Sequence, residues 1–153
     1  ERLACLGFGG FRGFLNGSID LAFRWQPPGA DTARWYVVDY KSNRLPHGQR
    51  DPGRYRDYAP DALAVELGHA HYFLQYHLYL VALHRYLRWR VPGYDYDRHV
   101  GGVFYLFLRG MQGGSPEGDS GVFRDRPPRA RIEALSRLFE GADAAGMDGE
   151  VAE

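Results

Sequence analysis

The chain has 153 residues, of which 44% are hydrophobic and 25% are charged, values that suit one folded domain and exclude a disordered segment. Its formal net charge is zero, so bulk charge does not predict a nucleic-acid-binding surface. One cysteine excludes an internal disulfide and a cysteine-based zinc site, and together with the lack of a bilayer-spanning apolar run or a secretory signal it favours a reducing, cytoplasmic setting.

The first predicted elements are two strands that form a hairpin. Residues 18–24 alternate in polarity, and residues 35–41 are rich in aromatic and β-branched side chains. The Pro-Pro-Gly run at 27–29 breaks the chain between them. A hairpin centred between Gly29 and Ala30 therefore places residue 20 opposite residue 39.

A polar stretch and a long helix are predicted next. The stretch from Asn43 to Asp61 is too long for a simple turn, so we expect a functional loop there. Asp61 is the predicted N-cap of a helix that runs to about Arg90, with a break near Gly68. The apolar stripe predicted for this helix contains Leu67, Ala70, Leu74, Leu78 and Val81.

The last part of the chain completes an α/β pattern. Residues 101–109 are apolar on both faces and predict a central strand, and residues 121–123 predict a short edge strand. An amphipathic helix with Ile132, Leu135, Leu138 and Phe139 follows, before a small, acidic tail over 141–153 that we expect to fray. We therefore predict a single α/β domain over 1–153, with a mixed central sheet flanked by helices.

Two carboxylates and one amine are the residues in this pattern that could carry chemistry. The predicted hairpin makes Asp20 and Asp39 direct cross-strand neighbours, with Cβ atoms about 4.5–5.5 Å apart. Lys41, the only lysine beside 18 arginines, lies on the same strand face as Asp39. Carboxylates this close repel one another. A proton on one aspartate, Lys41 as a counter-ion, or a divalent cation such as Mg²⁺ could relieve that repulsion.

The amino-acid sequences of these segments resemble those of a known family. Gly-Ser-Ile-Asp-Leu at 17–21, followed by Val-Asp-Tyr-Lys-Ser-Asn at 38–43, resembles the nuclease signature of the RecB family of PD-(D/E)xK phosphodiesterases. Residues 74–79 resemble its Q-x-x-x-Y element, and residues 82–87 and 101–110 are also similar to RecB nuclease domains. The resemblance covers most of residues 13–140.

The resemblance implies a restriction-endonuclease-like core and magnesium-dependent hydrolysis of DNA, of the exodeoxyribonuclease V type. It implies that Asp20, Asp39 and the backbone carbonyl of Tyr40 bind Mg²⁺, a site that Mn²⁺ or Ca²⁺ could also occupy. Lys41 is the implied catalytic lysine. The supporting pair is Gln75 and Tyr79, which share a helix face because they are four residues apart.

The resemblance also implies a larger parent protein. It points to the C-terminal end of a subunit with an ATP-driven helicase, RecC-like and RecD-like partners, docking of a strand-exchange protein, and double-strand-break repair by recombination. The family's metal-binding histidine lies upstream of the first aspartate, whereas no histidine precedes His47 here. Because the chain also begins at Glu1 without methionine, we expect an N-terminally truncated fragment that binds metal weakly or is inactive alone. The alternative is a catalytically silent, nuclease-like module that binds DNA or a protein.

Contact with DNA has to be local in a chain without net charge. Arginine can hold phosphate and stack on bases, and tyrosine can stack on bases. The alternative for the polar loop is a solvated segment without a ligand. The candidates for DNA contact are Arg44, Arg50, Arg54, Tyr55, Arg56 and Tyr58.

Overall fold

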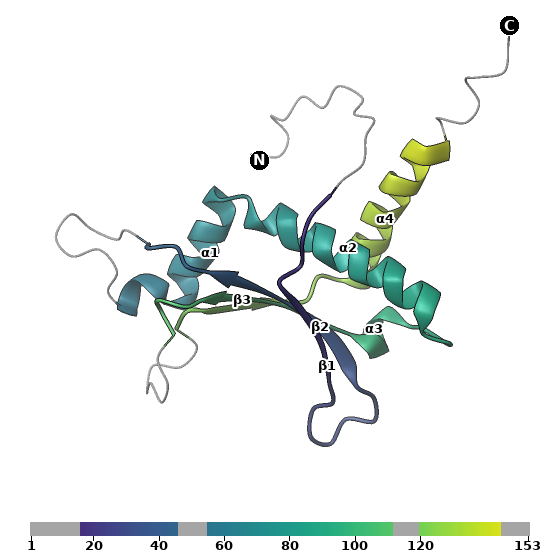
Figure 1. The fold of residues 1–153 in the computed structure, drawn as a ribbon, viewed down its shortest axis with the longest axis horizontal. Coiled ribbons are helices and arrows are strands. Elements are labelled where there is room, and N and C mark those ends of the chain that lie inside the picture. Colours follow the sequence, from purple (N-terminus) through teal and green to yellow (C-terminus); the bar gives the residue numbers. More distant parts are fainter. Residues whose placement is uncertain (1–15, 46–54, 112–119, 145–153) are drawn as a thin grey trace, which may run out of the picture.

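The computed structural model describes residues 16–45, 55–111 and 120–144, with the backbone alone described for 55–56 and 141–144. Figure 1 shows helices packed along a twisted sheet. The elements are β1 (Leu21–Trp25), β2 (Arg34–Lys41), the 3₁₀ helix η2 (Tyr55–Tyr58), α1 (Pro60–His69), α2 (Tyr72–Arg90), α3 (Tyr96–His99), β3 (Val100–Phe107), β4 (Val122–Asp125) and α4 (Arg129–Ala144).

The four strands form one mixed sheet in the order β1-β2-β3-β4. β2 and β3 are parallel, and each has an antiparallel partner at its other side. In the hairpin Leu21 pairs with Val38 and Trp25 with Arg34, so paired residue numbers sum to 59, which is the predicted register. The predicted central strand is β3 and the predicted edge strand is β4, so the α/β fold with a mixed sheet is confirmed and is compatible with a nuclease-like core.

The long helix predicted after the polar stretch is divided in two. α1 ends at His69 and α2 begins at Tyr72. Between them His71 has a φ of 56°, a left-handed conformation that cannot continue a helix. Asp61 was wrongly predicted as the N-cap. Ala59 takes that position and Pro60 is the first helical residue, because the fixed φ of proline and its missing N–H suit the first turn.

The apolar stripe predicted for the long helix is buried only in part. Leu67 and Val81 are buried as predicted, but Leu74 is 48% exposed. Leu74 and Val81 are seven residues apart on α2 and share a face, so Leu74 is exposed because it lies in the first turn of the helix, just after the break at His71. In α4 the predicted stripe also fails at Leu138, which is 70% exposed, whereas Ile132 is fully buried.

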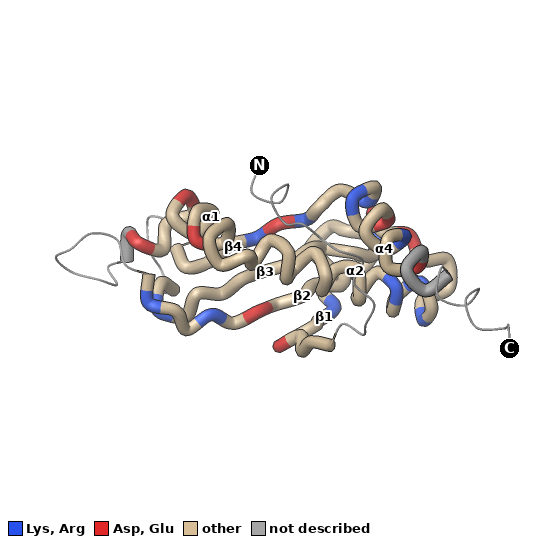
Figure 2. Tube along the Cα trace, turned by 90° about the horizontal axis from the view of Figure 1, so that it is seen from above, with Lys and Arg blue, Asp and Glu red and all other residues tan. Residues whose placement is uncertain are grey.

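The core lies between the sheet and α2, which also packs against α1 and α4. Figure 2 shows α1, α2 and α4 grouped along one side of the strands, with acidic and basic residues scattered and no stripe of one sign along the described trace. The largest fully buried side chains of the described residues are Tyr58, Tyr76, Tyr96, Tyr105, Phe107, Leu63, Leu67, Leu80, Leu87, Ile132, Val37 and Val100.

Two further observations bear on the sequence predictions. α4 continues through Ala144, past the start of the predicted frayed tail, and residues 145–153 lie outside the described part of the chain. None of the described helices combines the length and the apolar character that crossing a bilayer requires.

We predict that Gly110→Ala lowers the free energy of unfolding by roughly 1–3 kcal/mol, the usual cost of forcing extra atoms into a packed core. A Cβ at this position would overlap Cβ and the ring of Tyr58, which is fully buried. The matched control is Gly68→Ala in α1, where a new Cβ meets only Phe73 at 3.8 Å. Urea denaturation should show the control unchanged or more stable, since alanine favours helix over glycine. Equal effects at both positions would contradict this packing.

Candidate metal and nucleic-acid site

β2 presents Asp39 and Lys41 on the sheet face that α2 covers. Residues two apart in a strand point to the same side, and Val37, two residues before Asp39, is fully buried on that side. Asp39 is only 3% exposed, and the side chain of Lys41 is 12% exposed. Tyr40, between them, points to the other face and is 45% exposed. β2 therefore places the Asp39 carboxylate and the Lys41 ammonium in the largely buried layer between the sheet and α2.

Asp39 and Lys41 form an ion pair inside this layer. The Lys41 Nζ atom lies 2.7 Å from Asp39 Oδ2. This oxygen is buried, and no donor meets hydrogen-bond geometry toward it in the described structure. Its neighbour Oδ1 accepts a long hydrogen bond of 3.4 Å from the Tyr79 hydroxyl. The carboxylate is thus neutralised by an ammonium while its hydrogen-bonding capacity remains largely unused.

Asp20 stands beside this pair at the end of the hairpin. It directly precedes β1, and the pairing of Leu21 with Val38 makes Asp20 the next residue in register with Asp39. Its Oδ2 atom accepts a hydrogen bond of 2.9 Å from the backbone N–H of Tyr40. Asp20 is exposed, in contrast to Asp39. One carboxylate therefore faces solvent and the other is buried, at adjoining positions on one hairpin.

α2 supplies the polar partners of Lys41. Gln75 accepts from Lys41 Nζ through Oε1 at 3.3 Å. Its Nε2 atom donates to the Tyr79 hydroxyl at 2.7 Å, one helical turn further along. Tyr79 in turn reaches Asp39, so the two members of the Q-x-x-x-Y pair contact the lysine and the buried aspartate respectively.

Tyr105 fixes the orientation of the Gln75 amide. Burial, with the Asp39 carboxylate as a second cause, raises the pKa of Tyr105 well above its usual range, so its hydroxyl stays protonated. It donates to Gln75 Oε1 at 2.8 Å. Burial and Asp39 likewise raise the pKa of Tyr79. The carbonyl end of the amide therefore faces Lys41 and its NH₂ end faces Tyr79.

The donors available to a metal ion here are oxygen atoms. Across residues 16–45, 55–111 and 120–144, no group of three or more His, Cys, Asp or Glu side chains could hold a metal ion. The donor set is thus Asp20, Asp39, the Tyr40 carbonyl and water. Mg²⁺ is commonly held by one or two carboxylates while it keeps several waters, whereas structural zinc requires four protein ligands. Asp39 Oδ2, which is ion-paired with Lys41 but accepts no hydrogen bond, and the hard donor set fit Mg²⁺.

Among the predicted DNA-contact residues, the structure describes the side chains of Arg44 and Tyr58 only. Arg44 is exposed just beyond β2. Arg50 and Arg54 lie outside the described residues, as do the side chains of Tyr55 and Arg56. The remaining candidate, Tyr58, was wrongly predicted to contact DNA.

Tyr58 is instead a fully buried core residue. Its hydroxyl donates to the Asn43 carbonyl at 3.0 Å and accepts from the Leu45 N–H at 3.3 Å. An aromatic ring with two such backbone contacts anchors the start of the polar loop to the core. A sequence rich in arginine and tyrosine does not distinguish this role from a ligand contact.

Two aromatic neighbours of Lys41, and the Asn43 contact that holds one of them, were missed by sequence reasoning. The Tyr72 ring lies 4.0 Å from Lys41 Nζ and the Tyr105 ring 5.0 Å from it. Asn43 donates to the Tyr72 hydroxyl at 2.9 Å. Two signals could have pointed to them. Tyr72 is three residues before Gln75 on a helix, and a parallel register of β2 with β3 pairs Asp39 with Tyr105.

The sequence as a whole is similar to known proteins. It is 48% identical over 134 residues to the RecBCD enzyme subunit RecB of Haemophilus influenzae, covering 88% of this chain and 10% of that protein. It is 42% identical over 130 residues to RecB of Escherichia coli and 43% identical over 149 residues to RecB of Mycobacterium tuberculosis, covering 85% and 92% of this chain. The chain belongs to the RecB family. It spans about a tenth of the length of these RecB proteins, and no protein-family profile matches it.

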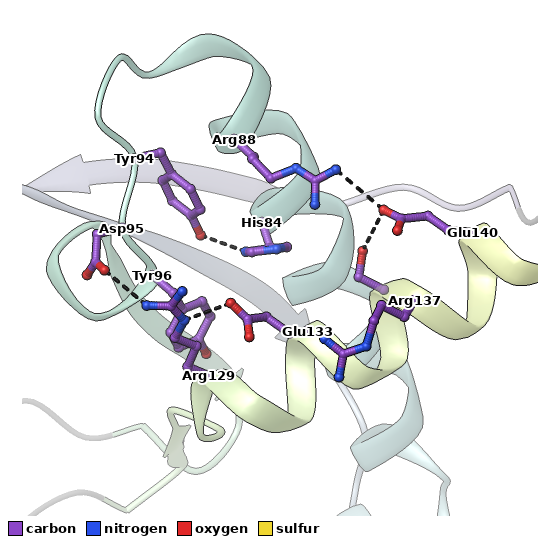
Figure 3. A pocket seen from close by; sticks show the side chains of 10 residues that line it. His84, Arg88, Tyr94, Asp95, Tyr96, Arg129, Glu133, Arg137 and Glu140 are labelled. Carbon is purple, nitrogen blue, oxygen red and sulfur yellow. Dashed lines mark hydrogen bonds and ion pairs between the residues drawn. The ribbon is translucent and has the colours of Figure 1, made fainter.

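A second polar region of this RecB homologue lies away from the aspartates. A hollow of about 420 Å³ lies between the C-terminal half of α2, the α3 segment and α4. Figure 3 shows the side chains that line it. Its charges pair with each other: Arg129 contacts Glu133 at 2.7 Å and Asp95 at 3.2 Å, and Arg88 contacts Glu140 at 3.5 Å. The hollow joins α4 to the rest of the fold and contributes no residue to the Asp39–Lys41 cluster.

His84 is a buried titratable residue of this hollow. It is 4% exposed, and its Nδ1 atom lies 2.9 Å from the Tyr94 hydroxyl. Burial, with Arg88 as the next cause, lowers the pKa of His84. The neutral ring is therefore the form that the folded protein favours.

We predict that removing Lys41 alone destabilises the fold. Lys41→Met leaves the Asp39 carboxylate buried without a counter-ion, which should lower the free energy of unfolding by roughly 3 kcal/mol. The double variant Asp39→Asn/Lys41→Met should recover most of this loss in urea denaturation. Arg129→Met is the surface control and should have little effect, because exposed pairs contribute little. A double variant as unstable as Lys41→Met would contradict the buried pair.

The stability of the protein should fall below about pH 6.5, the ordinary pKa of histidine. The folded state has the lower His84 pKa, so the unfolded state binds more protons as the pH falls. This contribution is complete above pH 6.5 and is lost in acid. Urea denaturation at pH 7.5 and 5.5 should show a smaller loss in His84→Gln, whose amide can bond Tyr94 but does not titrate. An identical loss in both proteins would show that His84 is not responsible.

Proposed function

We propose that this chain hydrolyses DNA phosphodiester bonds with a divalent metal ion, as the nuclease region of a RecB subunit. The observation that carries the proposal is the 2.7 Å contact between Lys41 and the buried Asp39 Oδ2, an oxygen without a hydrogen bond in the described structure, with Asp20 next to Asp39 in the hairpin register. The family membership supports it, because the relatives are subunits of the RecBCD enzyme. A purely structural hairpin has no need of a carboxylate pair that destabilises it.

The chain's own residues have distinct tasks in this proposal. Asp20, Asp39 and the Tyr40 carbonyl would hold Mg²⁺, which when bound polarises a phosphate and lowers the pKa of a water. Lys41 offers a positive charge beside a DNA phosphate and offsets the charge that grows on it during attack. Gln75 keeps the ammonium at a fixed place, and Tyr79 keeps Asp39 oriented. The exposed Arg44 is the described candidate for holding the DNA backbone.

The larger setting is also proposed from the relatives. We infer that the chain works with RecC-like and RecD-like subunits and that both strands of duplex DNA are cut in turn, during double-strand-break repair by recombination. An ATP-driven helicase in the same parent subunit and docking of a strand-exchange protein belong to this proposal. These inferences rest on names that the relatives carry, each of which is about ten times longer than the matched region.

One observation favours a rival function, a nuclease-like module that binds DNA or a protein without cutting. Lys41 already neutralises Asp39 within the fold, so the buried carboxylate is stable without a cation. In such a module the pair would be a structural contact. Metal binding and cleavage separate the two functions, because a silent module needs neither Asp20 nor Lys41 for DNA binding.

We predict that Mn²⁺ titration in a calorimeter detects one site, and that Asp39→Asn weakens or abolishes it. Plasmid cleavage with Mg²⁺ or Mn²⁺ should fall at least about a hundredfold in Asp20→Asn, Asp39→Asn and Lys41→Met, the usual scale for removing charge stabilisation. Asp31→Asn is the matched control, since Asp31 is an exposed aspartate in the same hairpin. It should bind and cut as the wild type does.

The result that would overturn hydrolysis is cleavage that persists unchanged in Asp39→Asn or Lys41→Met at equal folded fraction. DNA binding with neither a metal site nor cleavage would favour the silent module. Circular dichroism melting of each variant establishes the folded fraction before the comparison.

A further inference from the structure

The Lys41 ammonium lies against the rings of Tyr72 and Tyr105, which we call the aromatic wall. The proposed hydrolysis does not by itself require this contact. The Lys41 Nζ atom is 4.0 Å from the centre of the Tyr72 ring and 5.0 Å from that of Tyr105. Both distances are within the range of cation–π attraction. The remaining contacts of the ammonium are Asp39 at 2.7 Å and Gln75 at 3.3 Å. Four side chains from β2, α2 and β3 thus surround a single charged group.

The wall is held rigidly from both sides. The Tyr72 and Tyr105 rings lie 5.6 Å apart at an angle of 30°. Asn43 donates to the Tyr72 hydroxyl at 2.9 Å, and the Tyr105 hydroxyl donates to Gln75 at 2.8 Å. Tyr105 is fully buried, whereas Tyr72 is partly buried. The rings therefore cannot turn away without breaking a hydrogen bond, and they present their faces to the amine.

Such a wall is needed if Asp39 also binds a metal ion, as the proposed function requires. If Asp39 directs its oxygens at a cation, Lys41 loses the counter-ion that now holds it at 2.7 Å. Lysine has a flexible four-carbon stem, so an ammonium without a partner would explore many positions. Aromatic faces attract the ammonium without neutralising it or competing for the cation. Gln75 adds one neutral acceptor.

We propose that Tyr72 is a positioning residue for Lys41: its ring face, backed by Tyr105, keeps the ammonium in the site when Asp39 turns to another partner. This inference rests on the proposed function for its purpose, but its geometry can be tested without cleavage. It makes the ring of Tyr72 important and its hydroxyl dispensable. Tyr72→Phe keeps the ring, and Tyr72→Met removes it while keeping an unbranched, helix-compatible side chain.

Because Lys41 is the only lysine, the chain made with ¹³C,¹⁵N-lysine gives one set of side-chain signals in nuclear magnetic resonance. Protons above an aromatic face are shielded, so we predict upfield-shifted Lys41 Hε signals in the wild type. The shift should persist in Tyr72→Phe, diminish in Tyr72→Met, and persist after addition of Mg²⁺ alone. Asn43→Ser, which removes the hydrogen bond but no ring, should retain most of it.

Cleavage kinetics provide the second readout. The turnover number kcat should fall roughly tenfold in Tyr72→Met, a loss within the range of a partly desolvated cation–π contact, with KM for DNA unchanged. Tyr72→Phe should stay within about twofold of the wild type. A selective fall in kcat that the phenylalanine variant rescues is not expected from a merely structural residue.

Unshifted Lys41 signals in the wild type, or signals unaffected by Tyr72→Met, would overturn the positioning role. Loss of the shift on Mg²⁺ addition would overturn it as well, because the amine would have left the ring. If Tyr72→Met does not fold, the Lys41 Hε shift of the wild type, measured with and without Mg²⁺, still tests the positioning role. A shifted lysine in a protein that cuts no DNA would support the ring contact and count against hydrolysis by this chain alone. Cleavage without the shift would support hydrolysis and overturn the ring contact.

Discussion

The buried contact between Asp39 and Lys41 is the interaction on which the site depends. Removing two charges from water is unfavourable, and a 2.7 Å attraction offsets that cost only when further polar groups complete the shell. The sheet surrounds the pair with apolar neighbours, and α2 supplies Gln75 and Tyr79. The local twist of one hairpin and the position of one helix are therefore both conditions for keeping these charges inside.

The shell around this pair is directional. Burial keeps the Tyr105 hydroxyl protonated, so it donates to the Gln75 carbonyl oxygen. The Tyr79 hydroxyl accepts from the Gln75 NH₂ group. The two tyrosines together set the orientation of the Gln75 amide. Asp39 is left with an oxygen that no hydrogen bond satisfies. Networks of this kind are costly when incomplete, and incomplete ones concentrate at functional sites. The asymmetry between a buried Asp39 and an exposed Asp20 gives the site one side open to solvent.

The similarity to RecB and the geometry of the site support the same function by separate routes. The similarity extends over most of the chain and does not depend on how the site side chains are arranged in space. The geometry concerns a few side chains and would have the same chemical meaning in an unrelated fold. The second polar hollow shows the contrast, because its acids and arginines satisfy each other and leave no comparable unsatisfied group.

Much of the fold could be predicted from the sequence, because strand alternation and turn residues act locally. The hairpin register followed from the proline–glycine turn, and the central strand from its apolar run. The division of the long helix could not be predicted in detail, since His71 adopts a left-handed conformation that glycine would ordinarily signal. The exposure of Leu74 could not be predicted either, because the apolar stripe does not show that Leu74 lies in the first turn of a second helix. Tyr58 was assigned to DNA contact because composition does not report burial.

The sequence by itself determined which residues could do chemistry: two aspartates in register, a lone lysine beside one of them, and a glutamine and a tyrosine one helical turn apart. These relations are short-range, so strand and helix periodicity specify them. Only the tertiary structure decided that Asp39 is buried while Asp20 is exposed, and that the rings of Tyr72 and Tyr105 face the lysine. Burial and ring contacts arise where α2 and β3 pack on β2, and packing between distant segments leaves no periodic mark in the sequence.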